Sequence, residues 1–230
     1  MKVTVLNGRL FLVAFASALL AAPIYYAISA FFDASPNIFR IYFFTTIAAG
    51  SILAGYEIFF LIQARSNSRI ARILQTRLDR QIPFIPQFVW IYGFAYYFIL
   101  LIPLSFFHTY LTCTMFILGG LLVYSISAPI FLIFPTMCPP QWRQYAVENV
   151  STRFLYLIQN YDSGRCCFPS MHCSLAAYSA IFLPTWWASL IAPFVVALSC
   201  LFVKQHSVLE IPFSLIFGFV VGAVVKSSFT

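Results

Sequence analysis

The sequence contains FVWIYGFAYYFILLIPLSFF at residues 88–107 and CTMFILGGLLVYSISAPIFLIF at residues 113–134. Both runs lie within residues 81–142, a stretch without any Asp, Glu, Lys or Arg. Each run has about the ~20 apolar residues that an α-helix needs to cross a bilayer. Polar side chains between them, in residues 108–112, separate the two runs. The stretch therefore predicts two consecutive transmembrane helices joined by a short turn.

The composition of the whole chain points the same way. Of its 230 residues, 62% are hydrophobic and 8% are charged, whereas about a quarter are charged in soluble domains. These figures exclude a soluble globular domain, a disordered chain, a coiled coil, collagen and a small disulfide-stapled fold. The 19% of aromatic residues suits membrane interfaces. We therefore expect an all-α integral membrane protein, a bundle of about six or seven transmembrane helices.

Further apolar runs complete a single multi-pass membrane domain over residues 1–230. The expected spans are, in order, 10–32, 41–62, 88–107, 113–134, 171–184, 187–203 and 207–226. Small residues at 18–22 leave open the alternative that the first run is a cleaved signal peptide. The fifth and sixth runs predict a tight helical hairpin that turns at residues 184–187.

Two polar segments interrupt this pattern. Arginines alternate with apolar residues at 63–82, which predicts an amphipathic helix on the membrane surface. Residues 135–170 form a long polar loop, expected to be functional. The number of intervening spans places both segments and Lys204 at one membrane face. The positive-inside rule would make that face cytoplasmic, but arginines that bind phosphate would give the same asymmetry, so the side stays open.

The net charge of +7 suits anionic lipid head groups or a phosphate-bearing substrate better than nucleic acid. The six cysteines contain no CxxC pair. A zinc site would have to use Cys166, Cys167, His172 and Cys173, whose spacing matches no usual ligand pattern. A disulfide remains open if this loop faces an oxidising compartment.

Candidate catalytic residues are few, because the chain has three histidines and six carboxylates. His172 lies at the start of the predicted hairpin and His206 just after its end, so the hairpin brings the two together at one membrane face. Glu210 is four residues after His206, a spacing that in a helix allows the carboxylate to hold the imidazole. A carboxylate on one ring nitrogen makes the other a better nucleophile, and a second, protonated histidine can serve as general acid.

Positive and polar side chains around these histidines suit a phosphoryl group. Lys204, Arg165 and Arg143 supply cationic donors for its oxygens. Ser170 and nearby backbone amides at a helix start supply further anion contacts. Histidines and basic side chains can carry such a reaction without a metal or other cofactor.

Two segments resemble signatures of the type-2 phosphatidic acid phosphatase superfamily, which includes vanadium haloperoxidases. Residues 168–172 (FPSMH) resemble its second signature and residues 199–210 (SCLFVKQHSVLE) its third. Residues 78–86 (LDRQIPFIP) are similar to a segment in members of the phosphotransferase branch. The resemblance implies that His206 attacks phosphorus to form a phosphohistidine, that Glu210 orients it, and that His172 protonates the leaving group.

Residues 199–210 also depart from the pattern of the phosphatases. Cys200 stands in place of the arginine of the phosphatases, and Glu210 replaces the usual aspartate. Residues 204–206 (KQH) are closer to inositol phosphorylceramide synthase-like and sphingomyelin synthase-like transferases. The resemblance thus implies a lipid phosphate or phospholipid substrate, with water or the hydroxyl of another lipid or polyol as acceptor, and slightly favours transfer.

Two other classes of function remain open from the sequence. A small transporter or channel would use His172, His206 and Glu210 as a proton relay. An inactive member of the same superfamily would serve as a membrane scaffold. The clustering of titratable residues at one interface disfavours transport, because transporter sites usually lie near the midplane of the membrane.

Overall fold

The computed structural model describes residues 27, 46, 50, 51, 55, 57, 59–66 and 70–228. Within these residues the regular secondary structure is helical, with two isolated β-bridges at the loops. From residue 77 onward the elements are α3 (Arg77–Gln81), η1 (Pro86–Phe88), α4 (Val89–Phe106), α5 (Tyr110–Ile133), η2 (Pro140–Arg143), α6 (Val150–Tyr161), α7 (Met171–Ala180), α8 (Trp186–Phe202) and α9 (Glu210–Ser227).

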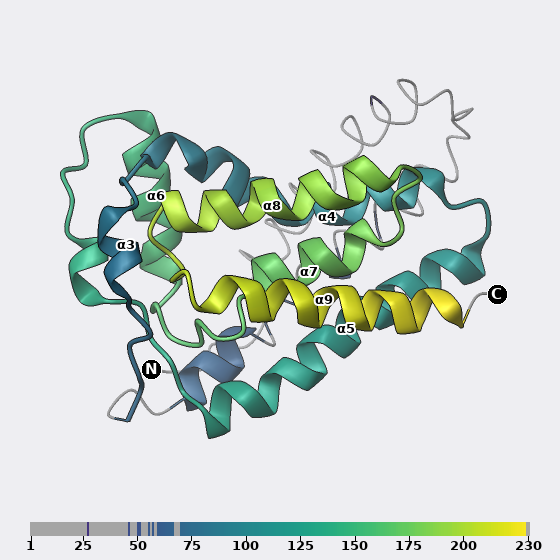
Figure 1. Cartoon of the computed structure of the whole chain (residues 1–230), viewed down its shortest axis with the longest axis horizontal. Helices are drawn as coiled ribbons and strands as arrows, with labels where there is room; N and C mark the ends of the chain where they lie inside the picture. Colours follow the sequence, from purple (N-terminus) through teal and green to yellow (C-terminus); the bar gives the residue numbers. More distant parts are fainter. Residues whose placement is uncertain are drawn as a thin grey trace.

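The long helices α4, α5, α8 and α9 run along the long axis of the molecule (Figure 1). Three segments of the described chain are long and apolar enough to cross a membrane: Pro86–Phe106, Leu111–Ile133 and Glu210–Ser227. They coincide with three of the spans expected from the sequence. The expected spans at 10–32 and 41–62 lie largely outside the described residues.

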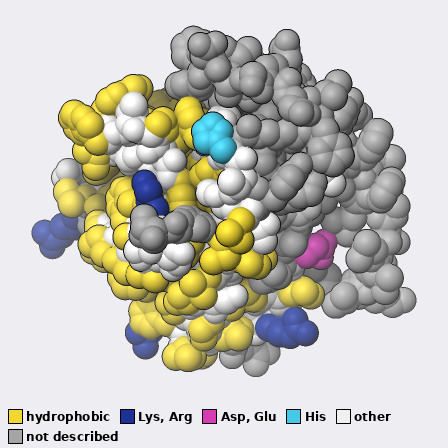
Figure 2. All heavy atoms as spheres, turned by 90° about the vertical axis from the view of Figure 1, so that its right-hand side faces the viewer, with side chains coloured by type: hydrophobic (Ala, Val, Ile, Leu, Met, Phe, Trp, Pro, Cys, Tyr) yellow, Lys and Arg dark blue, Asp and Glu magenta, His cyan; other side chains and the backbone are white. Residues whose placement is uncertain are grey.

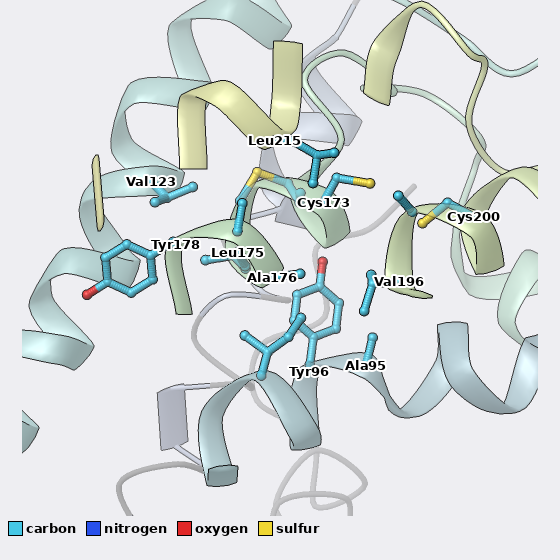
Figure 3. Packing of buried hydrophobic residues seen from close by; sticks show 14 of the residues in the cluster. Ala95, Tyr96, Val123, Cys173, Leu175, Ala176, Tyr178, Val196, Cys200 and Leu215 are labelled. Carbon is cyan, nitrogen blue, oxygen red and sulfur yellow. The ribbon is translucent and has the colours of Figure 1, made fainter. Parts of the chain in front are cut away.

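The short helix α7 lies in the middle of the bundle and packs against α4, α5, α8 and α9. Its residues are all buried except His172, which is partly exposed. Figure 3 shows how Cys173 and Ala176 of α7 meet Tyr96 of α4, Val196 of α8 and Leu215 of α9. The helix α7 is therefore surrounded by other helices and has no face toward solvent. Its first turn, which carries His172, is held in place by this packing.

Two glycines let α9 lie directly against α7. A Cβ atom on Gly218 would collide with the backbone carbonyl of Ser174, and one on Gly222 would come within 2.8 Å of the carbonyl oxygen of Tyr178. Small residues four apart on a helix allow close backbone approach of this kind. The α9 helix, which starts at Glu210, is thus held close to the helix that carries His172.

The predicted helical hairpin forms as α7 and α8, but its turn lies at residues 181–185 instead of 184–187. Neither helix is among the described segments long enough to cross a membrane, so the expected spans at 171–184 and 187–203 are not confirmed. The chain turns between Ala180 and Trp186, and α8 then returns to the end of the bundle from which α7 started (Figure 1). Its return places the segment 203–209 beside the start of α7. Figure 2 shows the opposite end of the molecule, where the described side chains are mainly hydrophobic with scattered basic ones.

The amphipathic helix predicted at 63–82 is not a single helix. The chain is helical up to residue 65, whereas residues 71–76 are not helical and α3 has five residues. The backbone of Arg72 pairs instead with the loop beyond α5, donating to Pro135 O and accepting from Met137 N, both at 2.9 Å. Thr76 then starts α3 with a reciprocal capping box to Asp79. This long-range backbone pairing explains why the helical periodicity of the sequence was misleading.

The polar loop predicted at 135–170 contains a twelve-residue helix, α6. Asn149 caps its start by accepting a hydrogen bond from the backbone of Thr152. Its side chains pack on α4 through Trp90, which stacks on Phe154 with ring centroids 4.9 Å apart and donates to Ser151 Oγ at 3.1 Å. The loop is therefore a folded cover at the end of the bundle where α3 and the starts of α7 and α9 lie (Figure 1).

Candidate active site

His206 and Glu210 form a buried pair between α8 and α9. The imidazole Nδ1 lies 2.8 Å from Glu210 Oε2, and the backbone N–H of Ser207 donates to the same oxygen at 3.1 Å. The exposed fractions of the two residues are 8% and 2%. The sequence predicted this contact from the spacing within a helix, but α9 begins only at Glu210 and His206 lies in the preceding turn. The expectation that both residues lie in one helix was therefore wrong, although the two side chains are in contact.

Glu210 also sets the protonation of His206. Burial on its own lowers the pKa of His206, but the hydrogen bond and charge of Glu210 outweigh it, with Cys173 and Asp162 acting in the same direction as Glu210. The pKa of His206 is therefore raised above its ordinary value of 6.5. Because a carboxylate only accepts hydrogen bonds, Nδ1 carries a proton and Nε2 is the atom left for chemistry.

His172 stands beside this pair on the first turn of α7. The centroids of the His172 and His206 rings are 6.3 Å apart. Two rings from α4 hold His172, with centroid distances of 4.1 Å to Tyr92 and 4.5 Å to Tyr96. Burial lowers the pKa of His172 well below 6.5, and the neighbouring His206 lowers it further. Both effects favour the neutral form of His172.

Ser170 ties the start of α7 to the start of α9. It is fully buried, and its hydroxyl caps α7 by accepting from Cys173 N at 3.4 Å. Its backbone N–H donates to Ser214 Oγ at 2.7 Å, and Ser214 in turn donates to the carbonyl of Glu210 at 2.6 Å. The sequence expected Ser170 to bind phosphate, and the structure places its hydroxyl in the helix cap.

The predicted phosphate-binding cation Lys204 is turned toward α3. Its ammonium group donates to the backbone carbonyls of Asp79 and Ile82, both at 2.6 Å, and lies 5.5 Å from the ring centroid of Trp142. Burial lowers the pKa of Lys204, and the charge of Asp79 opposes this shift. Lys204 thus connects the segment before α4 to the segment that carries His206.

The two predicted arginines lie in the cover formed by residues 135–170. Arg143 donates to the carbonyls of Asp162 at 2.6 Å and Gln159 at 3.2 Å, and its guanidinium lies 3.4 Å from the Asp162 carboxylate. Arg165 donates to the carbonyl of Ser66 at 3.1 Å and to Ser163 Oγ at 3.1 Å. The guanidinium of Arg143 thus holds the loop together and that of Arg165 attaches it to Ser66, neither of which the sequence alone indicated.

Two polar side chains next to His206 are buried without a partner among the described residues. They are the amide nitrogen of Gln205 and the hydroxyl of Ser207, on residues that are 3% and 2% exposed. Buried polar groups nearly always have hydrogen-bond partners, so an unpartnered pair beside a reactive imidazole is typical of a binding site. The sequence analysis did not single out either residue.

The six cysteines are free thiols, and the described residues contain no cluster of metal-ligating side chains around them. All six lie within the described residues, and all six are buried free thiols. Among the residues that the structure describes, no group of three or more His, Cys, Asp or Glu is placed to hold a metal ion. The zinc alternative at residues 166–173 therefore has no geometric support in this part of the chain.

Comparison with known proteins adds no relative. No protein-family model, no curated protein and no solved structure matches the chain.

Proposed function

We propose that the protein is a membrane-embedded phosphatase or phosphotransferase that acts on lipid phosphates or phospholipid head groups. The observation that carries the proposal is the buried pair of His206 and Glu210, 2.8 Å apart, with the partly exposed ring of His172 centred 6.3 Å from that of His206. The α7–α8 hairpin and the turn before α9 bring these groups to one end of the bundle. This is the arrangement that nucleophilic catalysis by an oriented histidine requires.

The reaction would proceed in two displacements at phosphorus. Glu210 holds the Nδ1 proton of His206, and Nε2 attacks the phosphorus while the bond to the leaving oxygen breaks. His172 donates the proton that this oxygen needs, because an anionic phosphoryl group nearby favours its protonated form. Water or an acceptor hydroxyl then loses its proton to His172 and attacks the phosphorus. The N–P bond breaks, and His206 is regenerated.

The phosphoryl oxygens would be bound by groups that the free protein leaves without partners. Gln205 and Ser207 flank the nucleophile and have buried donors that are not otherwise used. We assign them the role that the sequence gave to Lys204 and Arg143. The ammonium of Lys204 and one terminal nitrogen of Arg143 donate to backbone carbonyls, whereas Nε of Arg143 is buried without a partner among the described residues. Lys204 and Arg143 would then favour binding of the anionic phosphoryl group through their positive charge more than through direct hydrogen bonds to its oxygens.

We favour head-group transfer over hydrolysis. Cys200, which replaces the arginine of the phosphatases, is fully buried in α8 and lies beside Cys173 (Figure 3). The site therefore lacks one cation that would hold free phosphate. The acceptor would be a hydroxyl-bearing lipid or a polyol. The whole molecule would be a bundle of about six or seven spans with this site at one membrane face.

A phosphate-fate assay on the detergent-purified full chain tests the proposal. Head-group-labelled and phosphate-labelled phospholipids are supplied with and without a hydroxyl-bearing lipid, and His206→Ala is compared with wild type. We expect a new labelled lipid that requires the acceptor, and a loss of at least about 10³-fold in His206→Ala, because the nucleophile is gone.

The matched control is His108→Ala, which removes the exposed histidine that precedes α5. It should retain wild-type turnover. Acceptor-independent release of phosphate would identify a phosphatase instead. Equal and negligible turnover by wild type and His206→Ala across a broad lipid panel would contradict the proposal and would favour transport or scaffolding.

A further inference from the structure

Asp79 is a buried carboxylate that joins two segments distant in sequence. It is 1% exposed, and its Oδ2 accepts hydrogen bonds from the backbone N–H and the hydroxyl of Thr76 at 2.6 and 2.7 Å. Its Oδ1 accepts from the backbone N–H of Val208 at 2.8 Å. A buried carboxylate is costly unless hydrogen bonds satisfy it. Both oxygens of Asp79 are satisfied, one within α3 and one across to the segment that carries His206.

Three further contacts attach the same two segments. The ammonium of Lys204 donates to the carbonyls of Asp79 and Ile82, and the N–H of Ile85 donates to the carbonyl of Phe202 at 3.0 Å. Residues 79–85 therefore run along residues 202–208 and contact them at several points. Lys204 has a φ of 58°, in the left-handed region that a residue with a side chain rarely adopts. The turn before His206 thus has a shape that its neighbours must hold in place.

Val208 lies inside the turn that presents Glu210 to His206. The turn closes with Glu210 N donating to Ser207 O at 3.1 Å, and Ser207 N donates back to Glu210 Oε2 at the same distance. The N–H of Val208, between these two residues, is held by Asp79. Any movement of Val208 would therefore change the relative position of the imidazole and the carboxylate.

We propose that Asp79 is a positioning residue, which fixes the turn at Val208 so that Glu210 can orient His206. Its effect on the His206–Glu210 pair follows from the contacts alone, whereas its effect on turnover rests on the proposed function. Asp79 does not touch the reacting atoms. It is held in place by the capping box of α3, and it holds the turn before α9, which carries the proposed nucleophile, through its hydrogen bond to Val208.

Histidine NMR on the full chain in detergent tests this inference directly. The chain has three histidines, so the resonances of an imidazole-labelled sample can be assigned with single His→Gln variants. Glu210, Cys173 and Asp162 are the groups whose charge acts on His206, and His206 in turn lowers the pKa of the neighbouring His172. In Asp79→Ala we expect the pKa of His206 to fall by about 0.5–1 unit, in the same direction as in Glu210→Gln.

A comparison with Asp79→Asn separates position from charge. Asn lacks the negative charge but keeps an oxygen that can accept from Val208 N, so the pKa of His206 should stay close to its wild-type value. Equal shifts in Asp79→Ala and Asp79→Asn, or no shift in either, would overturn the proposal. Thr76→Val is the matched control, because it removes the side-chain cap of α3 and leaves Asp79 Oδ1 facing Val208.

Turnover provides the second readout and separates the two proposals. A shifted pKa with no turnover by wild type leaves the positioning role intact and rejects the proposed function. Turnover that requires His206, together with an unshifted pKa in Asp79→Ala, does the reverse. If Asp79→Ala does not fold to a monodisperse protein, Asp79→Ser replaces it, because its hydroxyl oxygen stands one bond short of the Oδ1 position.

Discussion

Oε2 of Glu210 accepts two hydrogen bonds, from the imidazole of His206 and from the backbone of Ser207. This one atom therefore fixes both the ring and the turn that carries it. The buried carboxylate stabilises the protonated imidazole, which explains why the pKa of His206 rises despite burial. A residue that merely capped α9 would not need to reach back to a side chain four positions earlier.

Replacing Glu210 by Gln should make stability depend less on pH. A group with a pKa raised in the folded state stabilises the protein fully below its unfolded pKa, near 6.5, and loses this contribution as the pH rises through the folded pKa. The apparent melting temperature of wild type should exceed that of Glu210→Gln by about 2–4 °C more at pH 6 than at pH 9. Thermal unfolding in detergent at the two pH values measures this difference.

Glu148→Gln is the control for that measurement, since it makes the same change at an exposed carboxylate in the loop before α6. It should melt like wild type at both pH values. A gap between wild type and Glu210→Gln that is constant with pH would mean that the carboxylate does not stabilise protonated His206.

Among the helices, those with long apolar runs were predictable and those fixed by distant partners were not. The helices α4, α5 and α9, and the α7–α8 hairpin, follow from runs of apolar residues, although the hairpin turns at residues 181–185, a few residues before the predicted turn. The path of residues 70–76 depends on backbone bonds to residues 135 and 137, which no local pattern encodes. The helix α6 has a capping box at Asn149 and an amphipathic sequence, two local signals that identify it in retrospect.

In the candidate site, too, some contacts were predictable from the sequence and others were not. The meeting of His172, His206 and Glu210 follows from the hairpin and from short spacings in the sequence. The partners of Lys204 are 122 and 125 residues away, and Val208 is 129 residues from Asp79. Such contacts are set by the packing of whole segments. The destination of a single long side chain was therefore not predictable, nor was the contact between Asp79 and Val208.

The contact between α7 and α9 should not tolerate a methyl group. Gly218→Ala places a Cβ against the carbonyl of Ser174, a backbone group that cannot turn aside, so we expect a loss of about 1–3 kcal/mol of stability. In Gly120→Ala, on α5, the new Cβ would meet only Tyr178, at 3.9 Å. This matched variant should be neutral or slightly more stable, because Ala favours a helix.

Thermal unfolding of the two glycine variants in the same detergent gives the comparison. The Gly218 variant should also lose turnover, because α9 carries Glu210 at its first position. Equal melting temperatures for both variants would mean that α7 and α9 do not pack as closely as the structure places them.

At the scale of the whole molecule, the bundle has two chemically different ends. The proposed site, the cover formed by residues 135–170 and α3 lie at one end, and the helix α9 ends at the other (Figure 1). The apolar helices between them are the parts long enough to cross a membrane. If they do cross it, an exposed residue in the cover and an exposed residue at the end of α9 must lie on opposite sides.

Cysteine labelling in sealed vesicles tests this arrangement. Starting from a variant without the six native cysteines, Glu148→Cys reports on the cover and Ser228→Cys on the far end, since both positions are exposed. A membrane-impermeant maleimide should label one of them in intact vesicles and the other only after permeabilisation. Labelling of Glu148→Cys in intact vesicles would place the site on the outer face of the vesicle, and labelling of Ser228→Cys would place it on the inner face. Labelling of both from the same side would contradict a bundle that crosses the membrane along its long axis.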